Sequence, residues 1–288
     1  MTMRSRGWLA VFVSSLLLAA RPIAQKPPAL PELLTLANGY VADYAQKLDA
    51  VAAEEEFTQY ETSSGRMTTP KRVMSAIVLI GQSDGSILDF RDVVAIDNVP
   101  VRAKDDRLAA MCTSITPEAV ANAQHLTDEA VRAYYSPNLH VLDRPTAALD
   151  LLRPGNADNY TFKMDGMKNV NGVQAAVLSF KEKGRGHLMP NAAAVGKFWV
   201  GAADGAIQQT ELGFIADNIN VHATVKFAND PQLHVLVPSE LFEQVETSGS
   251  GSNMSNMGAA SEGGLGAHQA LEGRAVYSKY RRLGTPDK

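Results

Sequence analysis

The sequence has a single cysteine, no long hydrophobic run and no clustered positive charge, and each absence excludes a class of protein. Cys112 has no second cysteine to pair with, so stability must come from a hydrophobic core rather than from an intramolecular disulfide. The 27 Lys and Arg residues are dispersed among 31 Asp and Glu, which argues against a nucleic-acid partner or an anionic membrane surface. No apolar segment reaches the roughly 20 residues of a transmembrane helix, so no transmembrane anchor is predicted.

Motifs for catalysis and metal binding are also missing. The chain contains no Gly-x-Ser-x-Gly elbow, and its six histidines lack the spacing typical of zinc ligands. His222 and His234 fall on neighbouring expected strands, but a surface or hydrogen-bonded role is favoured for both. We therefore predict a non-enzymatic protein with no catalytic residue, metal or cofactor, and keep an envelope hydrolase as the least favoured alternative.

The N-terminal residues have the pattern of an export signal. Arg4 and Arg6 precede an apolar run from Trp8 to Ala20, which is too short to span a bilayer. We predict a cleaved signal peptide over residues 1–24 and a Pro-rich spacer over residues 25–29. Because no cysteine follows the run to accept a lipid, the protein is expected to be periplasmic or secreted without a lipid anchor.

Hydrophobic periodicity predicts the first elements. Apolar residues recur at helical spacing from Leu30 to Ala52, which indicates an amphipathic helix. Residues 73–80 are nearly all apolar, a pattern typical of a strand covered on both faces. The next expected strand, residues 88–97, places four apolar residues on one face (Leu88, Phe90, Val94 and Ile96) and three charged residues on the other (Asp89, Arg91 and Asp97).

The remaining chain predicts a helical insertion followed by an antiparallel meander. The insertion covers residues 105–153, and in it Thr116 caps a helix that begins at Pro117. Short turns such as Asn171-Gly172 then join strands of alternating pattern. Residues 247–267 are rich in Gly, Ser, Asn and Met and are expected to form a flexible loop before the last strand.

Together these elements define the fold class. We predict a mainly β (α+β) protein with a single domain over residues 30–284. Its curved antiparallel incomplete barrel has about ten strands, with an N-terminal helix and the helical insertion covering the concave face.

This order of elements resembles the LolA/LolB-type incomplete barrels of periplasmic lipoprotein carriers and outer-membrane lipoprotein receptors. Local motifs are similar to a set of uncharacterised exported bacterial proteins: residues 89–93, 97–102, 106–108, 197–200 and 275–278. The first resemblance implies non-catalytic binding of a lipid or a lipoprotein acyl chain, a role in envelope biogenesis, and a lipid or an acylated protein as the partner. The second brings no catalytic residue.

The concave face is the expected binding site. If the helices fill it, it is only a core; if they fill it loosely, it is a cavity for an apolar ligand. Phe198 and Trp199 are neighbours in a strand and point to opposite faces, so only one of them can line the concave face. The candidate cavity residues are Trp199, Phe198, Phe214, Phe162, Phe227, Leu34 and Val41.

The densest mixed-charge stretch, residues 89–107, has two interpretations. The favoured one is a solvated hairpin and helix start, in which Arg91 pairs with a neighbouring acid. The alternative is a docking surface for an envelope protein partner, as in an envelope-stress-type regulatory sensor. Its candidate contacts are Arg91, Asp92, Arg102 and Arg107.

Overall fold

The computed structural model describes residues 28–63, 66–67, 69–102, 105–135, 142, 144–184, 186, 192–215, 219–247 and 269–284. The predicted signal peptide over residues 1–24 and nearly all of the predicted loop over residues 247–267 lie outside the described residues. Within the described ranges, no helix combines the length and the hydropathy needed to cross a membrane.

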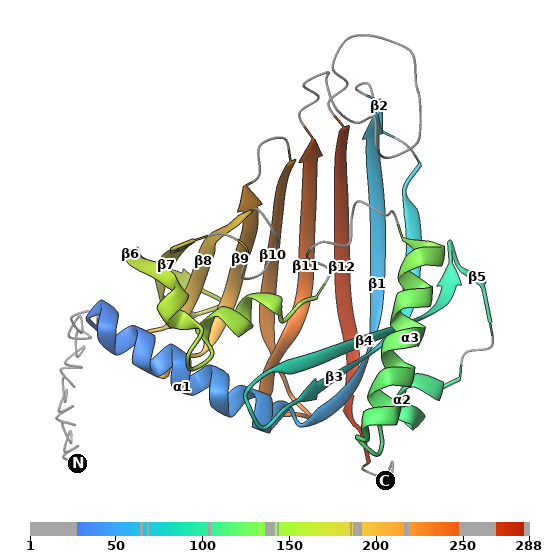
Figure 1. The fold of residues 1–288 in the computed structure, drawn as a ribbon, viewed down its shortest axis with the longest axis horizontal. Coiled ribbons are helices and arrows are strands. Elements are labelled where there is room, and N and C mark those ends of the chain that lie inside the picture. The colour runs from blue at the N-terminus through green and yellow to red at the C-terminus, as the bar shows by residue number, and fades with distance from the viewer. Residues whose placement is uncertain are drawn as a thin grey trace, which may run out of the picture.

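Twelve strands form one curved, open, antiparallel sheet, and helix α1 lies across its concave side (Figure 1). The strand order is β5-β4-β3-β1-β12-β11-β10-β9-β8-β7-β6, and β2 pairs with β1. The strands are β1 (Ala50–Ser63), β2 (Arg66–Met67), β3 (Lys71–Gly81), β4 (Ile87–Ile96), β5 (Val99–Pro100), β6 (Tyr160–Val170), β7 (Val173–Glu182), β8 (Ala193–Gly201), β9 (Ile207–Ile215), β10 (Ile219–Asp230), β11 (Val235–Thr247) and β12 (Gln269–Arg282). Because β2 and β5 have only 2 residues each, the longer strands agree with the predicted number, and the predicted mainly β, incomplete-barrel class is confirmed.

Helix α1 (Leu30–Leu48) begins with a proline in its first turn, where the missing N–H costs no helical hydrogen bond. It ends earlier than the helical spacing predicts. Asp49 adopts a φ of 54°, in the left-handed region, and this turns the chain directly into β1. The apolar residues Val51 and Ala52 therefore belong to a strand.

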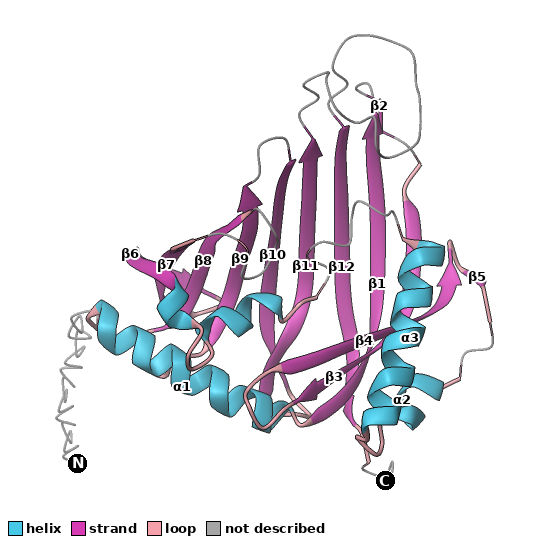
Figure 2. Cartoon of the chain, viewed as in Figure 1, coloured by secondary structure: helices cyan, strands magenta, loops and turns pink. Residues whose placement is uncertain are grey.

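The helical insertion contains α2 (Arg107–Met111), α3 (Pro117–Tyr134) and a 3-10 helix, η1 (Ala147–Leu152), and a second 3-10 helix, η2 (Ala157–Asn159), follows it before β6. The predicted cap is confirmed, because the Ala119 N–H donates to Thr116 Oγ1 at 3.1 Å. Figure 2 shows the helices in two places: α1 lies with η1, and α2 lies with α3 apart from them.

Strand β3 is covered on both faces, as its apolar run predicts. Ile77 and Leu79 pack in the same cluster as α1, on what we call the inner face of the sheet. Val78 and Ile80 point the other way and pack with Leu108 of α2, on the outer face. One strand thus separates two hydrophobic cores.

The position of α2 and α3 corrects the prediction that the whole insertion covers the concave face. Among the helices described in the insertion, only η1 has all of its buried side chains on the concave, inner face. Helix α2 and Ala123 of α3 pack on the outer face. The physical reason is that Phe90 projects from the outer face of β4 and needs a cover there. The helices supply this cover, and Phe90 is only 1% exposed. Helix α3 continues along β4, and at its C-terminal end Tyr135 reaches the inner face, where its ring lies 5.5 Å from that of Phe57.

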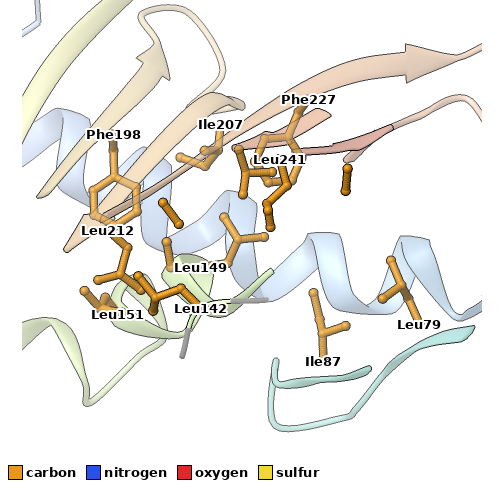
Figure 3. Close-up of a cluster of buried hydrophobic side chains, with 14 of the residues drawn as sticks. Leu79, Ile87, Leu142, Leu149, Leu151, Phe198, Ile207, Leu212, Phe227 and Leu241 are labelled. Atoms are coloured by element: carbon orange, nitrogen blue, oxygen red, sulfur yellow. The ribbon is translucent and has the colours of Figure 1, made fainter. Parts of the chain in front are cut away.

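The inner core lies between the sheet, α1 and η1. Figure 3 shows side chains of the sheet and of η1 meeting beside α1, together with Leu142, and the labelled ones are Leu79, Ile87, Leu142, Leu149, Leu151, Phe198, Ile207, Leu212, Phe227 and Leu241. Stacked and tilted rings of Tyr160, Phe162, Phe180 and Phe198 extend this cluster toward the β6 edge.

Candidate functional site

Helix α1 presents one apolar face to the concave side of the sheet. Leu33, Ala37 and Val41 follow one another at helical spacing and are fully buried. The leucines of η1 pack into the same cluster, so α1 and η1 together form the cover of the inner face.

Two glycines let the sheet approach the backbone of α1 very closely. A Cβ on Gly205, in the turn between β8 and β9, would overlap the Leu36 carbonyl group, and its φ of 73° also favours glycine. A Cβ on Gly81, at the end of β3, would overlap the Ala45 carbonyl group. Helix α1 is therefore seated at its middle and at its C-terminal end by steric fit.

Hydrogen bonds fix the C-terminal end of α1 to the sheet. Arg282 of β12 donates to the carbonyl oxygens of Leu48 at 3.3 Å and of Lys47 at 3.1 Å. The N–H of Gly81 donates to the carbonyl oxygen of Asp49 at 2.6 Å. These contacts satisfy carbonyl groups that a helix end leaves without an intrahelical partner.

A cleft of about 630 Å³ opens beside α1, between the helix and the ends of the meander strands. Its apolar lining includes Tyr40 and Tyr44 of α1 and Phe227 of β10, and its polar lining includes Lys47 and Asp204. The two tyrosine rings are stacked, with centroids 5.7 Å apart. This volume lies within the roughly 300–1,000 Å³ of typical ligand pockets.

Tyr44 is the most unusual residue of this cleft. It is 2% exposed, and its hydroxyl has no hydrogen-bond partner among the described residues. Burial raises the pKa of Tyr44 well above its ordinary value. Burial, with a smaller contribution from Asp204, likewise raises the pKa of Tyr40. Both phenols therefore remain neutral hydrogen-bond donors throughout the physiological pH range.

Most of the predicted cavity residues meet on the inner face. Phe198, Phe214, Phe227 and Val41 are buried in the inner core, and two more are partly buried against it, namely Phe162 and Leu34. Their packing fills the space between the sheet and its cover, so this part of the concave face is a core. The open volume lies at the cleft beside α1.

Trp199 requires a correction. It packs with Ala175 and Val177 on the outer face and is 6% exposed, so it does not line the concave face. Phe198 takes the inner position instead, because successive residues of a strand point to opposite faces.

The mixed-charge stretch agrees in part with its favoured interpretation, because its turn over residues 97–101 is exposed and Arg91 pairs with an acid. Arg91 and Asp92 themselves are 2% and 3% exposed, so neither is solvated and neither can dock a partner. Arg91 donates to both carboxylate oxygens of Glu55, from Nε at 2.8 Å and from Nη2 at 2.9 Å.

Asp92 is held by two arginines on the other side of β4. Arg107 donates to it from Nε at 2.7 Å and from Nη2 at 2.9 Å, and Arg102 forms a second ion pair with the same carboxylate. Only Arg102 and Arg107 keep partial exposure. The ion pairs bind the insertion to β4, whereas the turn over residues 97–101 in the same stretch is exposed.

Sequence reasoning missed Tyr40, Tyr44 and Gly205 as site residues. Tyr40 and Tyr44 are four apart on one helix, and this spacing was the available signal that they share a face. Gly205 was recognisable as part of a turn, but its contact with α1 depends on tertiary structure. Of the two histidines considered as a pair, His234 lines the cleft beside α1 and His222 lines a separate surface hollow.

No family model and no curated protein matches this chain. Among solved structures, the chain is similar to a domain from Vibrio parahaemolyticus described as an outer membrane lipoprotein-sorting protein. That match has a TM-score of 0.35 and 9% identity, and it covers 88% of this chain and 94% of that one. The chain is also similar to a LolA superfamily protein from Nitrosomonas europaea, with a TM-score of 0.31 and 11% identity over 87% of this chain and 96% of that one.

A third similar structure is the MucA/MucB complex of Pseudomonas aeruginosa, with a TM-score of 0.23 and 8% identity over 88% of this chain and 100% of that one. The element order found here, an N-terminal helix followed by a curved open antiparallel sheet, is the one predicted from the sequence. At these identities the likeness transfers no residue role, partner or activity.

Proposed function

We propose that this protein is a non-catalytic binding or carrier protein for an apolar ligand, such as a lipid or a lipoprotein acyl chain. The ligand enters at the cleft beside α1 and takes the place of α1 side chains against the inner face. The proposal rests on two features found together: α1 and η1 cover the inner face through apolar side chains, and a cleft of about 630 Å³ opens beside α1.

Apolar packing is suited to such an exchange because it is non-directional. Burial of apolar surface contributes about 25 cal/mol per Å², whichever molecule supplies the surface. An acyl chain that replaces Leu33, Ala37 and Val41 would therefore recover much of the free energy lost when α1 moves outward. The hydrogen bonds from Arg282 would keep the last turn of α1 attached to the sheet, so this end of the helix would act as the hinge.

The export signal expected over residues 1–24 favours a site of action in the periplasm or outside the cell, and we propose a role in envelope biogenesis. The regulatory-sensor alternative is weakened, because Arg91 and Asp92 are buried in internal ion pairs. A sensor would have to dock through Arg102, Arg107 or another surface.

The proposal is tested by loosening α1 without touching the cavity residues. Gly205→Ala adds a methyl group that must push α1 away from the sheet, so binding of the neutral dye Nile red and of oleate should rise by severalfold. Native mass spectrometry of the purified protein should then find copurified lipid, and more of it in the variant.

The matched control is Gly284→Ala. Gly284 has a φ of 79°, so the substitution brings similar backbone strain, but no atom of the described residues lies within 4 Å of the added Cβ, and no described neighbour of Gly284 lines the cleft. Dye binding should stay at the level of the unmodified protein. If neither the protein nor the Gly205→Ala variant binds dye or lipid, the carrier proposal fails.

A further inference from the structure

The hydroxyl of Tyr44 points to the chemistry of the ligand, given the carrier function proposed above. We infer that the cleft beside α1 recognises an apolar chain bearing a neutral hydrogen-bond acceptor, such as the carbonyl of an acyl ester, and that Tyr44 donates the hydrogen bond.

A buried hydroxyl without a partner is costly to keep. Tyr44 lines the cleft, yet its hydroxyl oxygen is shielded from solvent and makes no hydrogen bond in the described part of the structure. Folding therefore leaves the desolvation of this group uncompensated, whereas phenylalanine would pack the same ring at no such cost. A ligand acceptor that reaches the hydroxyl removes the penalty.

The cleft favours a neutral acceptor over an anionic one. Lys47 and Asp204 line its rim with opposite charges, and both are exposed, so the rim gives no net attraction to a charged head group. The apolar part of the lining, including Phe227 and Leu236, offers no cation to a carboxylate that loses its water. An ester carbonyl accepts a hydrogen bond and is far less costly to desolvate.

Two other buried tyrosines provide matched controls. Tyr280 of β12 is equally buried, but its hydroxyl donates to the carbonyl oxygen of Pro238 at 2.7 Å. Tyr277 of the same strand has a buried hydroxyl with no partner among the described residues, as Tyr44 has, but it lies near Glu55 and Arg91 and is not part of the cleft lining.

The experiment compares three ligands of equal chain length, namely methyl oleate, oleate and octadecene, by displacement of Nile red. The unmodified protein should bind methyl oleate about tenfold more tightly than octadecene, the gain expected from satisfying one buried donor, and more tightly than oleate. Tyr44→Phe should remove the preference for the ester over the hydrocarbon and should raise the melting temperature of the empty protein.

The controls should separate recognition from packing. Tyr280→Phe should lower the melting temperature and keep the ester preference, because it removes a satisfied hydrogen bond outside the cleft. Tyr277→Phe should raise the melting temperature and also keep the preference.

Two outcomes overturn the inference. One is a Tyr44→Phe variant that melts lower and keeps the ester preference, since the hydroxyl would then be structural. The other is equal binding of all three ligands by the unmodified protein, which leaves the carrier function standing. Failure of all three to bind, in the Gly205→Ala variant as well, would overturn the carrier function itself.

Discussion

Helices α1 and α3 both cover parts of the same sheet, but they are held in different ways. Helix α1 lies on the inner face through apolar side chains and two glycine contacts. Helix α3 buries little apolar surface, since Ala123 and Ala130 are its only buried residues within the part of the helix that is described. Polar contacts add to the packing of Val120, Ala123 and Leu126 against the outer core.

These polar contacts follow α3 along β4 and β3. The Arg91 N–H donates to Thr127 Oγ1 at 2.8 Å, and Lys71 donates to the carbonyl oxygen of Tyr134 at 2.6 Å. The Tyr135 hydroxyl lies 2.9 Å from the hydroxyl of Ser75. Directional hydrogen bonds of this kind hold α3 in one position, whereas apolar packing lets another apolar surface replace α1. Under the carrier function proposed above, α1 is the movable cover and α3 is the fixed one.

The largest effect is expected where the fixed cover meets the buried ion pair. Arg91→Ala should lower the free energy of unfolding by about 3–5 kcal/mol, because Glu55 would keep a buried charge without its partner. Urea unfolding followed by circular dichroism measures this change.

The control for Arg91 is an exposed pair of similar geometry. Arg72 Nε lies 2.9 Å from Glu56 Oε1, with side chains 47% and 48% exposed, so Arg72→Ala should cost at most about 1 kcal/mol. Equal losses from the two variants would contradict the role given to burial.

A second substitution weakens the movable cover. Leu33→Ala removes a fully buried side chain of α1 and should cost about 2–5 kcal/mol, while dye binding by the remaining folded protein rises. The exposed residue Gln46 on the same helix supplies the control, because Gln46→Ala should change stability by no more than about 0.5 kcal/mol. A loss of stability with unchanged dye binding would argue against α1 as the movable cover.

A smaller loss is expected when the polar attachment of α3 is cut. Thr127→Val keeps the shape of the side chain but leaves the Arg91 N–H without its acceptor, which should cost about 1–3 kcal/mol. Dye binding should not change, since α3 does not cover the cleft. Urea unfolding measures the loss of stability, and dye titration measures binding. Increased dye binding by the variant would indicate that α3, rather than α1, is the movable cover.

The smallest effect concerns Cys112, which reports on the outer core. Burial raises the pKa of its thiol to about 11, so little reactive thiolate forms near pH 8 and labelling by a disulfide reagent should be slow. Gly205→Ala should leave this rate unchanged, because it opens the inner face only. Faster labelling in that variant would mean that the two covers move together.

The sequence predicted most elements because periodicity and turn chemistry are local signals. The cap at Thr116 and the Asn171-Gly172 hairpin depend on neighbouring residues alone, and both are found, the turn residues with φ values of 51° and 84°. The grouping of most of the predicted aromatic residues on the inner face likewise followed from alternation along the strands, but alternation left open whether that face is filled or hollow.

What the sequence could not predict depends on tertiary structure. An irregularity in the β3–β4 register, between Met74 and Ser75, reverses the alternation of β4, so Phe90 packs in the outer core and Ile96 against the inner one. Alternation groups residues by face but does not say which face is inside, and for this reason Trp199 and the insertion were misplaced. The partners of Arg91 and Gly205 lie far away along the chain.

The position of β12 affects how the chain can assemble. This last strand lies in the middle of the sheet, between β1 and β11, and pairs Val51 with Arg282. Until it arrives, the sheet consists of two separate halves with open edges facing each other. Closure of the sheet must therefore wait for β12, and such long-range pairing is slow, so the facing edges of β1 and β11 stay open until residues 269–282 are in place.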